Sequence, residues 1–168
     1  MDLKGVSFLF GESELILLLR LLRCKNIPFP RYEDEIDTEA ALEELREDQL
    51  VSGSWEALAV DQVIAFLLRA MDEASFCLYV FGGGYAAIFD TMLASIVLQK
   101  RGERWVIAPF QAFADARIFM LNSLQGLQVP CMLTVRSWEH AETLQFRTTK
   151  ELIKAAEELL PLEGRDGE

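Results

Sequence analysis

The sequence predicts a single α+β domain, built on an antiparallel sheet of five or six strands with helices packed on one face. The chain has 168 residues, of which 51% are hydrophobic, and this is enough to bury one core. Short β-type runs follow one another from Ser75 to Phe110, whereas the segments on either side have helical spacing. We expect the domain to span residues 1–161 and residues 162–168 to form a polar tail.

The N-terminal third is predicted to contain one strand and three helices. The strand covers Gly5–Phe10, and the first helix covers Glu14–Arg23. Leucine and isoleucine surround that helix almost completely, so it needs cover on most faces, from its own domain or from another chain. A loop with Pro28 and Pro30 ends it. A second helix is predicted over Glu39–Asp48, capped by Thr38, and a third begins near Asp61.

The rest of the chain is predicted to form an antiparallel meander followed by a helix, two strands and a last helix. Gly102 suits the tight turn before the fourth strand of the meander. The last helix is expected to be capped by Thr149. In chain order the expected elements are strands Ser75–Phe81, Tyr85–Thr91, Ala94–Gln99 and Arg104–Phe110, helix Phe113–Leu127, strands Cys131–Arg136 and Thr143–Thr148, and helix Lys150–Leu160.

Charge limits the possible partners. The formal net charge of -11 disfavours binding to nucleic acid or to anionic membrane surfaces. Nine acidic residues fall between Glu33 and Asp48, and we expect this segment to be exposed. It is either a solvated helix face or a docking surface for a basic segment of a protein partner. The candidate partner-binding residues are Glu35, Asp37, Glu43, Glu44, Glu47, Tyr85 and Trp105.

No catalytic, metal or cofactor site is expected. Gly82–Gly84 precedes a further β-type run, which favours a hairpin loop over a phosphate-binding loop. His140, the single histidine, has no nucleophile motif near it in the sequence and is expected in a solvated loop. The cysteines, Cys24, Cys77 and Cys131, form no metal-binding or disulfide pattern. Free thiols and an N-terminus without a signal-peptide pattern favour the cytoplasm, and Cys77 and Cys131 are expected to be buried.

Several segments resemble EspG-type chaperones of type VII (ESX) secretion. Val6–Phe10, the leucine-rich helix after Glu12 and the loop Ile27–Pro30 are similar to the opening of that family. Leu42–Val51 resembles the family's L-x-x-R-G-L-V step, with Asp48–Gln49 in place of the usual Arg-Gly, and Phe89–Pro109 is similar to strand pairs that end in a tryptophan and a proline. The resemblance implies a chaperone that binds helical-hairpin substrates. The family's chain is close to twice as long and consists of two related halves, so this chain would supply one half.

The leading functional hypothesis is therefore a non-enzymatic cytosolic adaptor or chaperone that binds a helical protein partner such as a secretion substrate. A chain of one half could complete the family arrangement as a homodimer. The alternative is a small-ligand sensor or regulatory domain with a pocket between sheet and helices that involves Tyr79, Tyr85 and Trp105. An enzyme is a third hypothesis.

Overall fold

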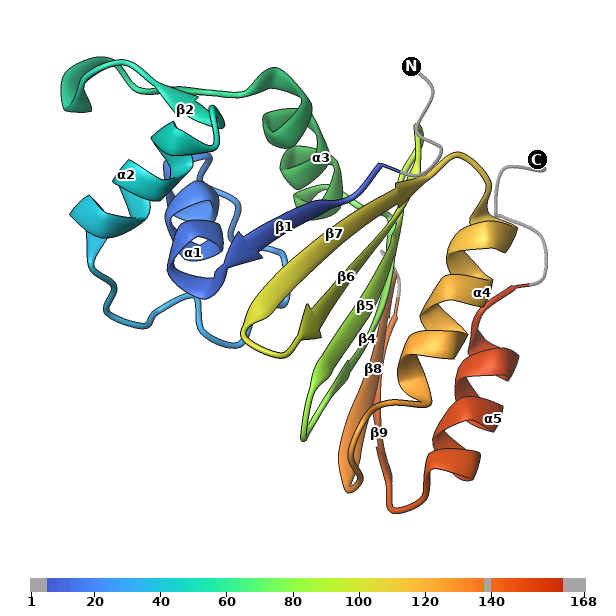
Figure 1. Ribbon diagram of the computed structural model, residues 1–168. Helices are drawn as coiled ribbons and strands as arrows, with labels where there is room; N and C mark the ends of the chain where they lie inside the picture. Colours follow the sequence, from blue (N-terminus) through green and yellow to red (C-terminus); the bar gives the residue numbers. More distant parts are fainter. Residues whose placement is uncertain (1–5, 138–139, 162–168) are drawn as a thin grey trace.

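The computed structural model describes residues 6–137 and 140–161, and it confirms the α+β class (Figure 1). One antiparallel sheet has the strand order β1-β7-β6-β5-β4-β8-β9. Its strands are β1 (Phe8–Gly11), β4 (Phe76–Phe81), β5 (Tyr85–Asp90), β6 (Ser95–Arg101), β7 (Arg104–Phe110), β8 (Cys131–Ser137) and β9 (Ala141–Phe146). The predicted tail, residues 162–168, and the predicted strand start at Gly5 lie outside the described residues.

The sheet has seven strands, more than the five or six predicted. The meander β4–β7 forms its centre, as expected. The N-terminal strand adds to one edge, where Phe10 pairs with Trp105, and β8 adds to the other side, where Leu78 pairs with Val135. Sequence spacing does not show that these distant strands join the same sheet, since their partners lie far away along the chain.

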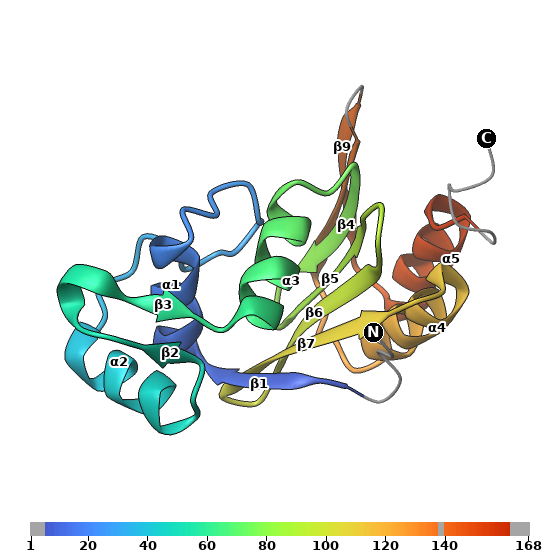
Figure 2. The same cartoon turned by 90° about the horizontal axis from the view of Figure 1, so that it is seen from above.

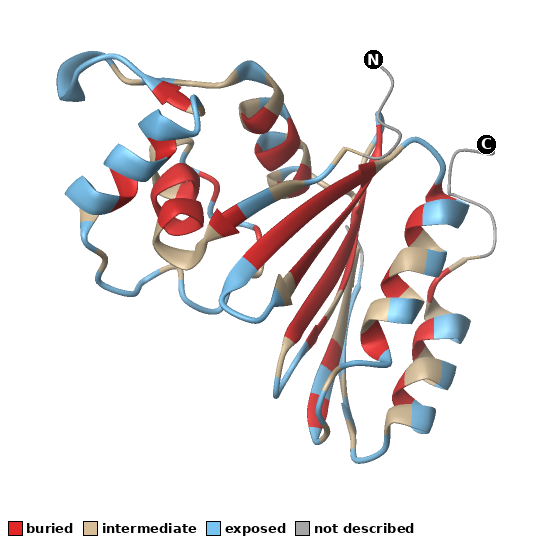
Figure 3. Cartoon of the chain, viewed as in Figure 1, coloured by how far each residue is buried: buried red, intermediate tan, exposed pale blue. Residues whose placement is uncertain are grey.

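Helices cover both faces of the sheet, not the single face predicted (Figures 1 and 2). On one face lie α1 (Glu12–Leu21), α2 (Thr38–Glu47) and α3 (Gln62–Asp72), and on the other lie α4 (Phe113–Leu124) and α5 (Thr149–Leu159). Strand β5 shows why: all six of its residues are buried, so both of its faces need cover (Figure 3). Each face has its own apolar core.

Helix α1 receives its cover from within the chain. Residues Leu15 to Leu19 are each at most 4% exposed, and α1 packs against α2 and strand β7. The predicted need for cover on most faces is therefore met without a second chain.

Two helix caps lie one residue earlier than predicted. The Asp37 carboxylate accepts a hydrogen bond from the Ala40 N–H at 3.1 Å, and the Thr148 hydroxyl accepts one from the Glu151 N–H at 3.3 Å. Each cap thus satisfies a free N–H group in the first turn of its helix. Thr38 and Thr149, the predicted caps, are the first residues of α2 and α5 instead.

A small hairpin that the sequence did not predict joins α2 to α3. Strands β2 (Val51–Ser52) and β3 (Ala59–Val60) pair around the short 3-10 helix Trp55–Ala57. Gly53 has φ +91°, and a Cβ atom there would lie 2.2 Å from the Ala57 carbonyl oxygen. Only glycine fits this turn.

None of the helices in the described part of the chain has the length and apolar character that a membrane crossing requires.

Candidate partner-binding site

The predicted acidic residues lie together on α2 and the loop before it. Glu35, Asp37, Glu43, Glu44 and Glu47 are all exposed, and we call this surface the acidic face. Helix α2 buries Ala41, Leu42 and Leu45 on its opposite side, so amphipathic spacing orients the carboxylates outward. The structure therefore confirms that the acids of this segment are exposed.

Cations within the segment do little to neutralise the acidic face. The one basic residue between Glu33 and Asp48 is Arg46, and its Nη2 donates to the Gly53 carbonyl oxygen at 2.6 Å. Arg31, just before the segment, lies 3.7 Å from Asp34 Oδ2 and 3.3 Å from Glu12 Oε2. The five acids of the acidic face form no ion pair within 4 Å among the described residues. They remain available to a basic partner.

A buried carboxyl group lies beneath the acidic face. Glu14 of α1 is 3% exposed, and its Oε1 accepts a hydrogen bond from the Gly11 N–H at 3.2 Å. Its Oε2 has no hydrogen-bond partner in the described part of the chain. Burial raises the pKa of Glu14 from 4.5 to about 7, and the neighbouring Glu44 carboxyl group and the charge of Asp48 add to the rise. When Glu14 is protonated, its carboxyl group can donate a hydrogen bond to the Glu44 carboxylate; two ionised carboxylates have no hydrogen to share.

Tyr85 and Trp105 lie in the core and not on the acidic face. Their side chains are 2% and 1% exposed, so neither offers a contact surface in this structure. The Tyr85 hydroxyl donates to the Pro28 carbonyl oxygen at 2.5 Å, and Phe29 packs on Trp105 with ring centroids 4.6 Å apart. Their observed role is to fix the proline loop to the sheet. The alternation of residues along a strand predicts towards which face of the sheet Tyr85 and Trp105 point. It does not predict that the loop with Pro28 and Phe29 covers that face.

A cavity of about 520 Å³ opens between the proline loop and strands β4, β8 and β9. Tyr79 and Tyr85 line it, as the ligand-sensor hypothesis expects, whereas Trp105 does not. Its walls also include Ile27, Phe29, Tyr32 and Thr143. The cavity lies between sheet and loop and not between sheet and helices.

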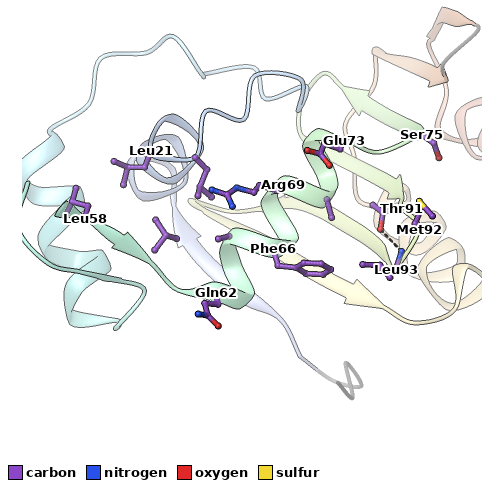
Figure 4. Close-up of a pocket in the computed structure, with 14 residues that line it drawn as sticks. Leu21, Leu58, Gln62, Phe66, Arg69, Glu73, Ser75, Thr91, Met92 and Leu93 are labelled. Carbon is purple, nitrogen blue, oxygen red and sulfur yellow. Dashed lines mark hydrogen bonds between the residues drawn. The ribbon is translucent and has the colours of Figure 1, made fainter. Parts of the chain in front are cut away.

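A larger apolar groove, of about 790 Å³, follows α3 (Figure 4). Leu21, Leu22, Leu58 and Val60 line it on the side of α1 and β3, and Met92 and Leu93 line it at the β5–β6 turn. We call it the α3 groove. It was not predicted from the sequence. The available signal was the pair Met92–Leu93 in a connection between two strands, where polar or small residues are usual.

The single histidine is exposed, whereas the three cysteines are buried. His140 is exposed, with Nε2 3.5 Å from Glu142 Oε2. Cys24, Cys77 and Cys131 are all free and buried, which confirms the predicted burial of the last two. Burial raises the pKa of the Cys77 thiol to about 12 and that of Cys24 to about 11. Among the described residues no three histidine, cysteine, aspartate or glutamate side chains are arranged to hold a metal ion.

Comparison with known proteins gives a likeness in fold. The chain is similar to a chain of the solved structure of the Mycobacterium tuberculosis type VII secretion system chaperone EspG5 in complex with a PE25–PPE41 dimer. The TM-score is 0.59 at 8% sequence identity, and the alignment covers 94% of this chain and 98% of the matched chain. No protein-family model matches the sequence, and no curated protein matches it. The likeness therefore shows an EspG-like fold.

The extent of this alignment bears on the half-chain expectation. The match spans almost all of the aligned chain and does not stop at one half of it. The comparison therefore gives no support to a half-length chain that a second copy completes.

Proposed function

We propose that the protein is a non-enzymatic cytosolic adaptor or chaperone that binds a helical protein partner. The observation that carries the proposal is the EspG-like fold, because the matched structure is that of a type VII secretion chaperone in complex with a protein dimer. Fold alone does not define function, so the proposal also needs a surface on which a partner can bind.

The acidic face supplies that surface. Its five carboxylates are exposed and form no ion pair among the described residues. They lie on α2 and on the loop before it, and the opposite side of α2 is buried in the core. A partner with basic residues beside an apolar helical stripe would be steered towards it and held in register. Tyr85 and Trp105 take no part in this contact because both are buried.

Affinity capture from the source cells, using three versions of the protein, tests the proposal. The variant Glu43→Lys/Glu47→Lys reverses two charges of the acidic face. The control Glu157→Lys/Glu158→Lys makes the same change in charge at two exposed glutamates of α5, on the other face of the sheet. We expect a protein partner in stoichiometric amount with the wild type and the control, and its loss from the acidic-face variant.

Salt gives a second readout with the purified partner. Exposed charges are screened over about 10 Å at 0.1 M salt, so the dissociation constant should rise at least about tenfold between 50 and 500 mM NaCl. An affinity that does not change with salt, or equal capture by all three versions, contradicts docking on the acidic face. Absence of any stoichiometric partner contradicts the adaptor function itself.

The second candidate function is a small-ligand sensor or regulatory domain, favoured by the cavity next to Tyr79 and Tyr85. Its volume of about 520 Å³ lies within the usual range for small-molecule sites. A ligand that binds the folded state raises the thermal midpoint as its concentration increases. A metabolite screen by thermal shift, with Thr143→Phe to fill the cavity mouth, separates this function from partner binding.

A further inference from the structure

The cavity between the proline loop and strands β4, β8 and β9 is lined by an unusual number of aromatic side chains. Aromatic residues make up 10% of the sequence, yet five of them line this one cavity: Phe29, Tyr32, Tyr79, Phe81 and Tyr85. We call it the aromatic cavity. The face of an aromatic ring carries partial negative charge, so several rings around one space attract an organic cation. The composition of the walls therefore indicates a class of ligand.

The register of the sheet brings three of these rings to the floor of the aromatic cavity. Phe81 pairs with Tyr85 on β5 and with Met132 on β8. Tyr79 lies two residues before Phe81 and points to the same face of the sheet, where it pairs with Thr134. Phe81 is 40% exposed and Met132 is 38% exposed. The floor is therefore open to a ligand and is not filled by the core.

The proline loop forms the opposite wall, and hydrogen bonds fix it at both ends. At one end the Tyr85 hydroxyl donates to the Pro28 carbonyl oxygen at 2.5 Å, and the neighbouring Phe29 side chain is 6% exposed. At the other end the Arg20 guanidinium donates to the Tyr32 carbonyl oxygen at 2.7 Å. The walls are therefore held in place before a ligand binds, which lowers the cost of binding.

The charges around the opening favour a cation. Lys25 and Glu33 are the charged residues that line the aromatic cavity, and both are exposed. Glu33 also begins the run of nine acids that ends at Asp48, whereas the nearby Arg31 is already paired with two acids. The opening therefore lies beside the most acidic segment of a chain with net charge -11. A negative potential of this kind raises the local concentration of cations.

The polar groups of the walls distinguish between kinds of cation. A primary ammonium group has three N–H donors, each of which needs an acceptor when the group leaves water. The Thr134 and Thr143 hydroxyls, which line the aromatic cavity, hydrogen-bond to each other at 3.0 Å. They therefore offer little to such donors. A quaternary ammonium group has no N–H and is stabilised by the aromatic rings alone.

We propose that the aromatic cavity binds a small quaternary ammonium compound, with Tyr79 and Phe81 against its cationic group. The volume of about 520 Å³ accommodates such a group together with a short organic body. This inference rests on the second candidate function, the binding of a small ligand, and it names the chemical class of that ligand.

Thermal shift with two matched compounds tests the need for a positive charge. Choline and its neutral carbon analogue have the same shape, but in the analogue a quaternary carbon atom replaces the nitrogen. We expect choline to raise the thermal midpoint with saturation in the millimolar range or below, and the analogue to bind at least about tenfold more weakly. Equal binding of the two compounds overturns the proposal, and so does the absence of binding by both choline and tetramethylammonium.

Substitutions at the floor test the location of the site. Phe81→Leu and Tyr79→Leu each remove a ring and keep an apolar side chain, so each should weaken choline binding at least about fivefold. Tyr79→Phe keeps the ring and should change the affinity by less than about twofold. Trp55→Leu removes a ring that is 54% exposed and does not line the aromatic cavity, and it is the matched control. Unchanged affinity in Phe81→Leu and Tyr79→Leu, with unchanged circular dichroism, overturns the assignment.

Lys25→Gln tests the sign of the ligand's charge. Loss of an exposed positive charge beside the opening should strengthen choline binding roughly twofold at low salt, whereas weaker binding would show a site for anions and overturn the proposal. The outcomes also separate this inference from the function on which it rests. If a neutral metabolite stabilises the protein and choline does not, the ligand-binding function stands and this inference falls. If no compound stabilises the protein, both fall.

Discussion

The buried carboxyl group of Glu14 should make the folded protein less stable as pH rises, and the single substitution Glu14→Gln should remove this effect. Burial raises the pKa of Glu14 from 4.5 to about 7, so the folded protein binds this proton more tightly than the unfolded chain does. Stability then falls as pH rises from about 4.5 to about 7 and is level above that range. The full loss is on the order of 3 kcal/mol, at about 1.4 kcal/mol for each tenfold change in the ionisation constant.

The variant Glu14→Gln keeps the acceptor for the Gly11 N–H and supplies an amide hydrogen to Glu44, but it does not ionise. Its stability should equal that of the wild type near pH 4.5 and exceed it by roughly 2–3 kcal/mol at pH 8. Urea unfolding followed by circular dichroism at pH 5, 6, 7 and 8 measures both curves. Glu43→Gln, an exposed change on the neighbouring helix, is the control. Parallel curves for wild type and Glu14→Gln would refute the reasoning.

Two further predictions concern thiols and a glycine. Cys24 and Cys77, whose burial raises their thiol pKa to about 11 and about 12, should react with a thiol reagent at pH 8 only as fast as the protein unfolds, and rapid labelling without denaturant would contradict their placement. Gly82→Ala should cost roughly 1–3 kcal/mol of folding free energy, because its Cβ would lie 2.8 Å from the Pro130 carbonyl oxygen and 2.8 Å from Cys131 Cβ. Gly126→Ala, whose Cβ would lie 3.8 Å from the Ser123 carbonyl oxygen, should cost at most about 1 kcal/mol under the same urea assay.

The order of elements could be predicted from the sequence, whereas their assembly could not. The alternation of strand and helix periods placed nearly every element within a few residues, from β1 to α5. The seven-stranded sheet depends on pairs such as Phe10 with Trp105, and no local pattern reports a contact between residues so far apart. The sequence does contain a sign that helices cover both faces of the sheet. Tyr85–Asp90 is apolar at almost every position, whereas a strand with one exposed face would be apolar at alternate positions.

For the candidate site too, some features could be predicted from the sequence and others depend on tertiary packing. Acids on an amphipathic helix have to face water, so the exposure of Glu43 and Glu47 follows from spacing alone. Tyr85 and Trp105 were predicted to bind a partner, but the loop Ile27–Pro30 packs against both of them. Glu14 looked like an ordinary acid in the first turn of a helix. Its burial depends on the tertiary packing of α2 over α1, which brings Glu44 to it.

The packing of α2 on α1 links the acidic face to the stability of the fold. Glu44 belongs to the acidic face, and the same carboxylate contributes to the raised pKa of Glu14 through its hydrogen bond and its charge. A basic partner that binds Glu44 would offset that negative charge and so ease the ionisation of Glu14. Binding should therefore release a fraction of a proton near pH 7, and by linkage the affinity of such a partner should rise between pH 6 and pH 8. Titration calorimetry in two buffers of different ionisation enthalpy measures that proton, and Glu14→Gln should abolish its release without abolishing binding. An unchanged proton release in Glu14→Gln would show that the acidic face and the buried carboxyl act independently.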